Sequence, residues 1–164
     1  MPEVEEAYAG PIFRVEVLRW PEKRRDVVRA LGSTGVVALT AERDVILVRQ
    51  EREAVGERLL EVPAGLHDTP GESPEGTGGR ELEEEAGYRA ATLEPLGRIH
   101  TSPGFVDEVC HLVLAEGCER VADPERGIEV VVLPLARALE AMDRGEITDA
   151  KTVAGLLLAA RRER

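Results

Sequence analysis

The chain has 164 residues, 43% of them hydrophobic and 32% charged, with a formal net charge of −11 at pH 7. This length fits one domain with a hydrophobic core. The acidic balance argues against nonspecific binding to nucleic acid or to an anionic membrane surface. Cys110 and Cys118 are too few for a disulfide framework. No apolar segment approaches the ~20 residues that span a bilayer, and the start carries no secretory signal. We therefore expect a cytoplasmic protein.

The first half of the chain favours strands. We expect residues 1–164 to form a single domain in which residues 1–11 are a flexible segment. From Ile12 to Trp20 apolar and polar residues alternate, as in a half-buried strand. Further strand candidates, the first of them the weakest, are residues 25–31, 35–40, 45–50 and 58–65.

An acidic helix follows, for which Ser73 is the predicted N-cap and Pro74 the first helical residue. Behind it the strand candidates are residues 91–102, 107–117 and 128–134. Pro134 then begins a second helix that Gly145 ends, and residues 148–164 show helical spacing again. The order of elements indicates the α+β class, a mixed sheet with a few helices.

The acidic helix contains the motif that carries the chemistry, "RELEEEAGY". At 100° per residue, Glu81, Glu84 and Glu85 fall within roughly one 100° arc of the helix. Leu82 lies on a different arc and is expected to pack inward, whereas Glu83 is expected to be solvated. Three carboxylates on one helix face form a site for a hard cation such as Mg²⁺, which prefers oxygen ligands and keeps waters for a substrate phosphate.

A charged, solvated helix would explain "ELEEEA" alone, but it leaves the glycines upstream unexplained. Gly76, Gly78 and Gly79 each cost a helix interior roughly 1 kcal/mol relative to Ala. Arg80 lies one turn before Glu84, so a salt bridge can hold that carboxylate in place. A solvated helix also leaves the punctuated approach "VPAGLHDTPGESP" unexplained, so the pattern extends over a longer segment.

That longer segment resembles the Nudix box of the Nudix hydrolase family. Glu72, the seven residues 73–79 and "RELEEEAGY" match the motif at every specified position. The departure is at its start: six residues separate Gly65 from Glu72, where the family usually has five. Pro70 and Gly71 can absorb the extra residue in a sharp turn.

The resemblance implies the Nudix fold, a mixed sheet sandwiched between helices with the box as a loop–helix–loop. It implies hydrolysis of a nucleoside diphosphate linked to another moiety, with Mg²⁺ as cofactor and Mn²⁺ as an alternative. The implied metal ligands are the carbonyl of Ala64 and the carboxylates of Glu81, Glu84 and Glu85. Glu72, Arg80 and Glu84 are the implied catalytic residues of the box, in which Glu72 and Arg80 orient the ligands.

Outside the box, the chain resembles the ADP-ribose pyrophosphatase branch of that family. The matching segments are "LVRQEREAVGERLLEVPAGL", "SPGFVDEVCHLVLAEG" and "GEITDAKTVAGLLLAA", and Pro103 lies fifteen residues beyond Tyr88, as is typical of the branch. The resemblance implies ADP-ribose as substrate, AMP and ribose 5-phosphate as products, and a homodimer.

The implied substrate contacts lie outside the acidic helix. Arg52 matches an arginine that contacts the diphosphate, Arg25 is a similar candidate, and either is also compatible with a plain surface charge. The other implied contacts are Pro103, Gly104 and Glu108.

The candidate for the catalytic base is Glu125, in a loop before a late strand, with Glu129 and Glu108 as rivals. A solvated loop acid is an equally acceptable reading of Glu125. Glu51 stands where the branch often has Tyr.

Two alternatives stay open. The same fold and metal site can hydrolyse another nucleotide sugar or a dinucleoside polyphosphate, because those preferences depend on loops. A regulatory Nudix domain would bind a nucleotide without cleaving it. Loss of a box carboxylate would favour that second alternative, and Glu81, Glu84 and Glu85 are all present.

Overall fold

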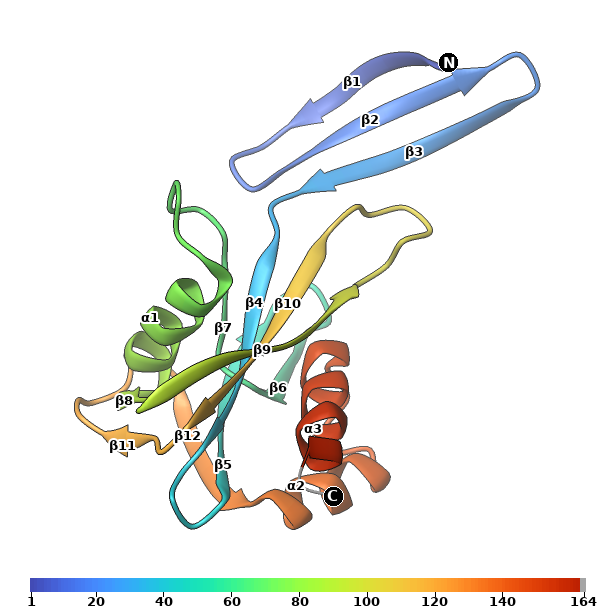
Figure 1. The fold of residues 1–164 in the computed structure, drawn as a ribbon. Helices are drawn as coiled ribbons and strands as arrows, with labels where there is room; N and C mark the ends of the chain where they lie inside the picture. The colour runs from blue at the N-terminus through green and yellow to red at the C-terminus, as the bar shows by residue number, and fades with distance from the viewer. Residues whose placement is uncertain (163–164) are drawn as a thin grey trace.

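The computed structural model describes residues 1–162, which are built around a central mixed sheet (Figure 1). The strand order is β12-β5-β4-β10-β9, with β6 paired to β5 and β7 to β4. The bounds are β4 (Ser33–Leu39), β5 (Asp44–Arg52), β6 (Glu57–Glu61), β7 (Ala64–Leu66), β9 (Thr92–His100), β10 (Val109–Glu116) and β12 (Glu129–Pro134). β10 runs parallel to β4, whereas β10 and β9 are antiparallel. The predicted α+β class is confirmed.

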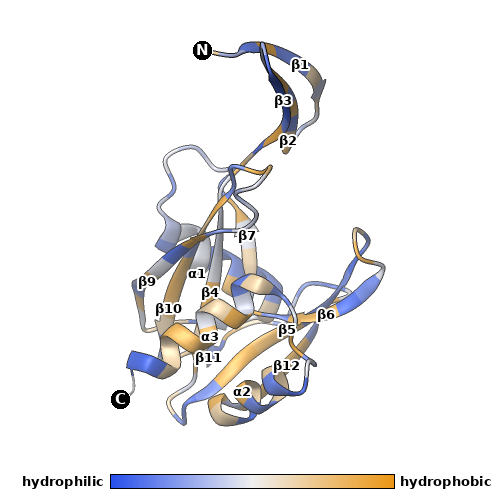
Figure 2. Cartoon of the chain, turned by 90° about the vertical axis from the view of Figure 1, so that its right-hand side faces the viewer, coloured by the Kyte–Doolittle hydropathy of each residue, from blue (hydrophilic) through white to orange (hydrophobic). Residues whose placement is uncertain are grey.

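Helices cover both faces of this sheet, α1 (Pro74–Ala86) on one and α2 (Leu135–Asp143) with α3 (Ala150–Arg162) on the other (Figure 1). β4 shows why. Val36 packs in the same cluster as Leu82 of α1, and its neighbour Val37 packs in the cluster of Leu156 of α3. Every residue of β4 is buried because both of its faces are covered. Figure 2 shows the apolar colouring of the central strands between the helices.

The glycine-rich start of α1 is explained by its distance from the sheet. A Cβ at Gly78 would lie 2.9 Å from Cγ2 of Val36, so only glycine lets the helix approach β4 this closely. The helix begins as predicted: Pro74 is in its first turn, and the Ser73 Oγ accepts a hydrogen bond from the Gly76 N–H at 3.1 Å. The close packing of α1 on β4 thus requires glycine at this position, although glycine lowers helix stability.

A second sheet at the N-terminus projects away from the central sheet (Figure 1). It consists of β1 (Glu3–Ala9), β2 (Phe13–Trp20) and β3 (Lys23–Ala30), all antiparallel in that order. Residues 1–11 are therefore not wholly the flexible segment that we expected. Every residue of β1 is exposed, so the strand leaves no apolar pattern in the sequence.

The loop between β9 and β10 connects this N-terminal sheet to the rest of the molecule. The Val28 N–H of β3 donates to the Phe105 carbonyl at 2.7 Å, and the Asp107 N–H donates to the Val28 carbonyl at 3.1 Å. Asp107 also accepts from the Ala30 N–H at 3.0 Å and from Arg29 at 3.2 Å. The loop thus adds a short parallel partner to β3.

Three further details differ from the predicted elements. The candidate strand 58–65 is divided into β6 and β7, because Pro63 has no N–H to donate to a ladder. Between the predicted strands 107–117 and 128–134 lies a short strand that was not predicted, β11 (Glu119–Arg120), which pairs with β8 (Tyr88–Arg89). The predicted last helix is α3, and residues 163–164 of that prediction lie outside the described residues. Among residues 1–162, none of the helices has the length and apolar character that crossing a membrane requires.

Candidate active site

Ala64 and Gly65, upstream of the box helix, share one cavity of about 490 Å³ with Arg52 and Glu108, whereas Glu81, Glu84 and Glu85 are not among its lining residues. Its walls come from the ends of β5 and β7, the start of α3 and the two ends of the loop between β9 and β10. The cavity lining includes Ser33, Arg52, Ala64, Gly65, Thr101, Glu108, Asp149 and Lys151. Three of the predicted site residues, Arg52, Ala64 and Glu108, thus share a cavity although they are far apart in the sequence.

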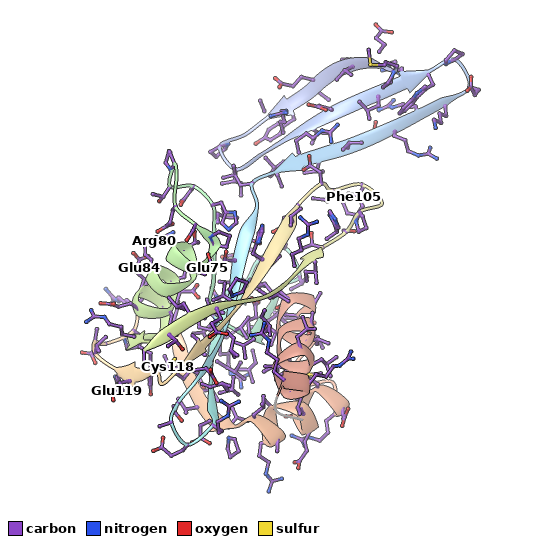
Figure 3. The ribbon with its side chains drawn as sticks, in the orientation of Figure 1. Glu75, Arg80, Glu84, Phe105, Cys118 and Glu119 are labelled. Atoms are coloured by element: carbon purple, nitrogen blue, oxygen red, sulfur yellow. The ribbon has the colours of Figure 1, made fainter. Side chains whose placement is uncertain are left out.

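Arg80, in the middle of α1, pairs with several acidic side chains, and Figure 3 labels it near Glu84. Its guanidinium pairs with four carboxylates: Asp68 at 3.8 Å, Glu72 at 3.3 Å, Glu81 at 2.7 Å and Glu84 at 3.1 Å. The predicted Arg80–Glu84 pair is therefore present. The Arg80 hydrogen bond is the main cause that lowers the pKa of Glu72, and the same bond raises the pKa of Arg80.

The extra residue before Glu72 is taken up by a turn, as expected. The Glu72 N–H donates to the Thr69 carbonyl at 3.2 Å, and Gly71 has a φ of 82°, which favours glycine. Glu72 remains close to the helix, because its carboxylate accepts from the Thr77 hydroxyl at 2.9 Å. The box thus keeps its internal contacts despite the longer loop.

Glu81 lies directly against the backbone of β7. A Cβ at Gly65 would collide with the Glu81 carboxylate, so glycine is required at this position. Burial raises the pKa of Glu81, although the charge and hydrogen bond of Arg80 act in the opposite direction. Glu81 is thereby fixed beside Ala64, whose carbonyl is the fourth proposed metal ligand.

Glu85 is the most buried of the box carboxylates, with a relative exposure of 8%. It accepts hydrogen bonds from the Ala64 N–H at 2.9 Å and from the Gln50 side-chain amide at 3.3 Å. Both donors are neutral, and burial raises the pKa of Glu85 to about 7. A buried carboxylate of this kind is stabilised by a cation.

The donor set fits a hard divalent cation. Glu81, Glu84, Glu85 and the Ala64 carbonyl offer only oxygen, the ligand type that Mg²⁺ and Mn²⁺ prefer. Within residues 1–162, no three His, Cys, Asp or Glu side chains form a ready-made metal centre. Arg80 pairs with both Glu81 and Glu84, so it occupies the carboxylates that a cation would draw together. The chemistry of the donors and their excess charge both favour metal binding.

The two leading candidates for the catalytic base lie at different places. Glu108 is in the cavity, where Ser33 Oγ donates to it at 2.7 Å and Thr101 Oγ1 at 2.8 Å. Glu125 is exposed, and its N–H donates to the Glu84 carbonyl at 3.0 Å, so its loop docks on α1. The rival Glu129 is paired with arginines, at 3.7 Å from Arg49 and at 3.6 Å from Arg58.

Three predicted substrate contacts are not brought to this cavity. Arg25 is exposed on β3, where its guanidinium donates to the Arg24 carbonyl at 2.9 Å. Pro103 and Gly104 line a separate cavity of about 280 Å³ under the N-terminal sheet, together with Phe105. Figure 3 shows Phe105 in the loop beneath that sheet.

Sequence reasoning missed a group of charges opposite α1. Glu61 has a relative exposure of 1% and accepts from Arg52 through Nε at 2.8 Å and through NH2 at 2.7 Å. Lys151 donates to both Glu61 and Asp149 at 2.8 Å. Asp149 accepts from the Thr152 N–H at 2.9 Å, which is the spacing of a helix N-cap and the signal that could have located this group.

Comparisons with known proteins agree with this geometry. Residues 31–156 match the NUDIX domain family. The chain is 38% identical over 143 residues to the ADP-ribose pyrophosphatase of Bacillus subtilis (strain 168), which covers 84% of this chain and 77% of that protein. It is 34% identical over 161 residues to the methanol dehydrogenase activator of Bacillus methanolicus, which covers 92% of this chain and 86% of that protein.

A crystal structure of an ADP compounds hydrolase superposes with a TM-score of 0.80. The match covers 97% of this chain and 90% of that chain at 24% identity, so it supports the fold alone. The family match spans the central sheet, the box helix and most of α3. This chain belongs to the Nudix family and to its pyrophosphohydrolases.

Proposed function

We propose that the chain is a Mg²⁺-dependent ADP-ribose diphosphatase that releases AMP and ribose 5-phosphate. The observation that carries the proposal is a cavity that brings Arg52 and Glu108 together with Ala64 and Gly65, which contact Glu85 and Glu81 of α1. An arginine in the cavity wall, next to a backbone segment that contacts the acidic helix, suits a diphosphate, whose charge needs cations on more than one side. The relative named ADP-ribose pyrophosphatase supports the choice of substrate.

The proposed ligands of Mg²⁺, with Mn²⁺ as a substitute, are the Ala64 carbonyl and the carboxylates of Glu81, Glu84 and Glu85. When bound, the metal neutralises the diphosphate and lowers the pKa of a coordinated water. Arg80 orients Glu81 and Glu84 through its ion pairs, and Glu72 in turn holds Arg80. Gly65 leaves the space that the Glu81 carboxylate needs.

On the substrate side, we propose that Arg52 binds the diphosphate and that Glu108 faces the sugar-phosphate half. Two hydroxyl donors fix the Glu108 carboxylate, which leaves its remaining lone pairs for sugar hydroxyls or for a water proton. Glu108 and Glu125 are the two candidates for the base that accepts this proton. Glu108→Gln and Glu125→Gln variants separate them, because loss of the base removes the acidic limb of the pH–rate profile.

We also propose a homodimer formed through the N-terminal sheet. Val4, Tyr8 and Ile12 are at least half exposed, and the whole of β1 lacks covering elements. Three strands of this kind need packing against another surface for stability. Arg25 and the cavity lined by Pro103 and Gly104 lie at this sheet. Their proposed contacts with the substrate therefore depend on dimer formation. Light scattering is expected to give twice the mass of one chain, and Val4→Lys is expected to lower it.

The free, buried state of Cys110 and Cys118 supports the proposal of a reducing, cytoplasmic setting.

The test of the function is AMP release from ADP-ribose with and without Mg²⁺. Release is expected only with the metal, and Glu85→Gln is expected to lower it by about 10³-fold, since a metal ligand supports several kcal/mol of transition-state stabilisation. Glu83→Gln is the matched control. It makes the same change on the same helix, at a side chain that faces Arg89.

Two other results would change the assignment. Hydrolysis of another nucleotide sugar or of a dinucleoside polyphosphate, with no AMP from ADP-ribose, would keep the Nudix chemistry and replace the substrate. Saturable ADP-ribose binding with no product in Mg²⁺ or Mn²⁺ would favour a regulatory binding domain.

A further inference from the structure

The charged group opposite α1 is built unlike a surface salt bridge. Glu61 is almost fully buried, and its carboxylate is shared between Arg52 of the preceding strand and Lys151 of the first turn of α3. Burial alone would raise the pKa of Glu61, but the hydrogen bonds and charges of Arg52 and Lys151 lower it. Glu61 is therefore a charged group that both cations keep ionised inside the protein.

The geometry of the Arg52–Glu61 pair leaves one edge of the guanidinium unused. Arg52 donates to Glu61 through Nε and NH2, which is the side-on fork of a bidentate pair. The other terminal nitrogen, NH1, makes no hydrogen bond within residues 1–162, and Arg52 lines the cavity. A guanidinium offers five N–H donors in a fixed plane, so fixing one edge also fixes the direction of the other.

Glu61 is itself held from two directions. Lys151 donates to Glu61 and also to Asp149, which limits the positions open to the ammonium group. The next residue, Val62, donates its N–H to Thr152 Oγ1 at 3.0 Å. The start of α3 thus contacts β6 through a side chain and through the backbone.

We propose that Glu61, braced by Lys151, is a positioning residue that aims the free edge of Arg52 at an anionic ligand in the cavity. The inference rests on the proposed function in one respect, because it takes the ligand to be a diphosphate. A pre-oriented arginine loses less side-chain entropy when the phosphate arrives, so the ligand binds more tightly. The competing explanation is a purely structural link that attaches α3 to β6.

A double-mutant cycle separates these two explanations. Arg52→Lys keeps the charge but removes the fork, and Glu61→Gln keeps the shape but removes the charge. ADP-ribose binding is measured by calorimetry in EDTA, so that no metal-dependent hydrolysis takes place. Each single variant is expected to weaken binding about 10-fold, since charge-assisted hydrogen bonds to phosphate are lost. The double variant is expected to bind no more weakly than the weaker single variant.

The control is Glu146→Gln, which breaks another side-on fork, formed by Nε and NH2 of Arg144 outside the cavity. It is expected to bind ADP-ribose as the wild type does. If Glu61→Gln does not fold by near-UV circular dichroism, Lys151→Met takes its place, with a smaller loss that again disappears in the Arg52→Lys background.

Losses that multiply in the double variant, or a thermal destabilisation of Glu61→Gln with unchanged binding, would overturn the inference in favour of the structural link. A wild type that does not bind ADP-ribose in EDTA would overturn it too. The proposed function is decided separately, by Mg²⁺-dependent AMP release from the wild type.

Discussion

Two charged clusters of the candidate site balance their charges differently. Opposite α1, two cations, Arg52 and Lys151, face two carboxylates, Glu61 and Asp149. On α1 itself, Arg80 alone serves four carboxylates, and the buried Glu85 has only neutral hydrogen-bond donors. The protein itself neutralises the charges of the first cluster, whereas the negative charge of the second is neutralised only by a bound cation.

This difference shows how one site can combine stability with chemistry. The balanced cluster connects the start of α3 to β6 and contributes to the folded state. The carboxylates of the acidic cluster repel one another, which lowers the stability of the metal-free protein. A bound cation removes this repulsion, and the free energy released adds to the metal affinity. Variants of the balanced cluster should therefore lower stability and ligand binding, whereas variants of the acidic cluster should lower metal affinity and activity at little cost in stability.

The largest expected effect on stability is at Glu61. Glu61→Ala leaves Arg52 and Lys151 without their shared partner, and breaking a buried ion pair in this way costs about 3–5 kcal/mol of unfolding free energy. Chemical denaturation of the metal-free protein measures this loss. Glu81→Gln on the acidic side is the comparison, and its loss should be much smaller because burial already disfavours the ionised carboxylate. Equal losses would remove the distinction between the clusters.

The pH dependence of stability sharpens the comparison. The pKa of Glu85 is raised from 4.5 to about 7 in the folded protein, so its contribution is complete below pH 4.5 and is lost as the pH rises to 7. At 1.36 kcal/mol per unit, the loss is about 3 kcal/mol.

Denaturation of the metal-free wild type across this pH range, minus the same series for Glu85→Gln, isolates the contribution. A difference that stays flat between pH 4.5 and 7 would contradict the assignment.

A substitution at Gly65 tests the acidic side without removing any charge. In Gly65→Ala the new Cβ displaces the Glu81 carboxylate, and Mg²⁺ affinity and hydrolysis are expected to fall by about 10²-fold, the upper range for disturbed metal surroundings. Calorimetric titration with Mg²⁺ measures the affinity.

The control is Gly97→Ala on β9, where the new Cβ meets only the end of the Leu158 side chain, at 3.3 Å. Mg²⁺ affinity in Gly65→Ala equal to that of the control would exclude Glu81 as a ligand.

The smallest expected effect is at an exposed ion pair outside both clusters. Glu83→Gln breaks the fork with Arg89, and both side chains are well exposed. Exposed pairs contribute little to stability because solvent screens them. The Tm and the rate of AMP release should therefore match the wild type, and a clear drop in either would show that Glu83 acts in the site.

Local patterns predicted the acidic cluster well. The cap at Ser73, the Arg80–Glu84 spacing and the inward position of Leu82 each depend on residues within one or two helical turns. The balanced side could not be predicted in the same way. Glu61 and Lys151 are 90 residues apart, and only the packing of α3 against the sheet brings them together.

The sequence also predicted a simpler arrangement of the α1 carboxylates than the structure shows. An angular count places Glu84 and Glu85 on one arc, but the sheet covers one edge of that arc and leaves the other open to solvent. Glu85 is consequently buried and Glu84 exposed. The N-terminal sheet escaped prediction in part because β1 has no buried side to impose a pattern.

The backbone hydrogen bonds between Val28 and the loop that carries Phe105 and Asp107 have a mechanical consequence. Glu108 follows Asp107 directly, so a displacement of β3 would be transmitted to one wall of the cavity. A partner that tilts the N-terminal sheet would reshape the cavity without touching it. Slow hydrogen exchange at the Asp107 amide would show that its hydrogen bond to the Val28 carbonyl persists in solution.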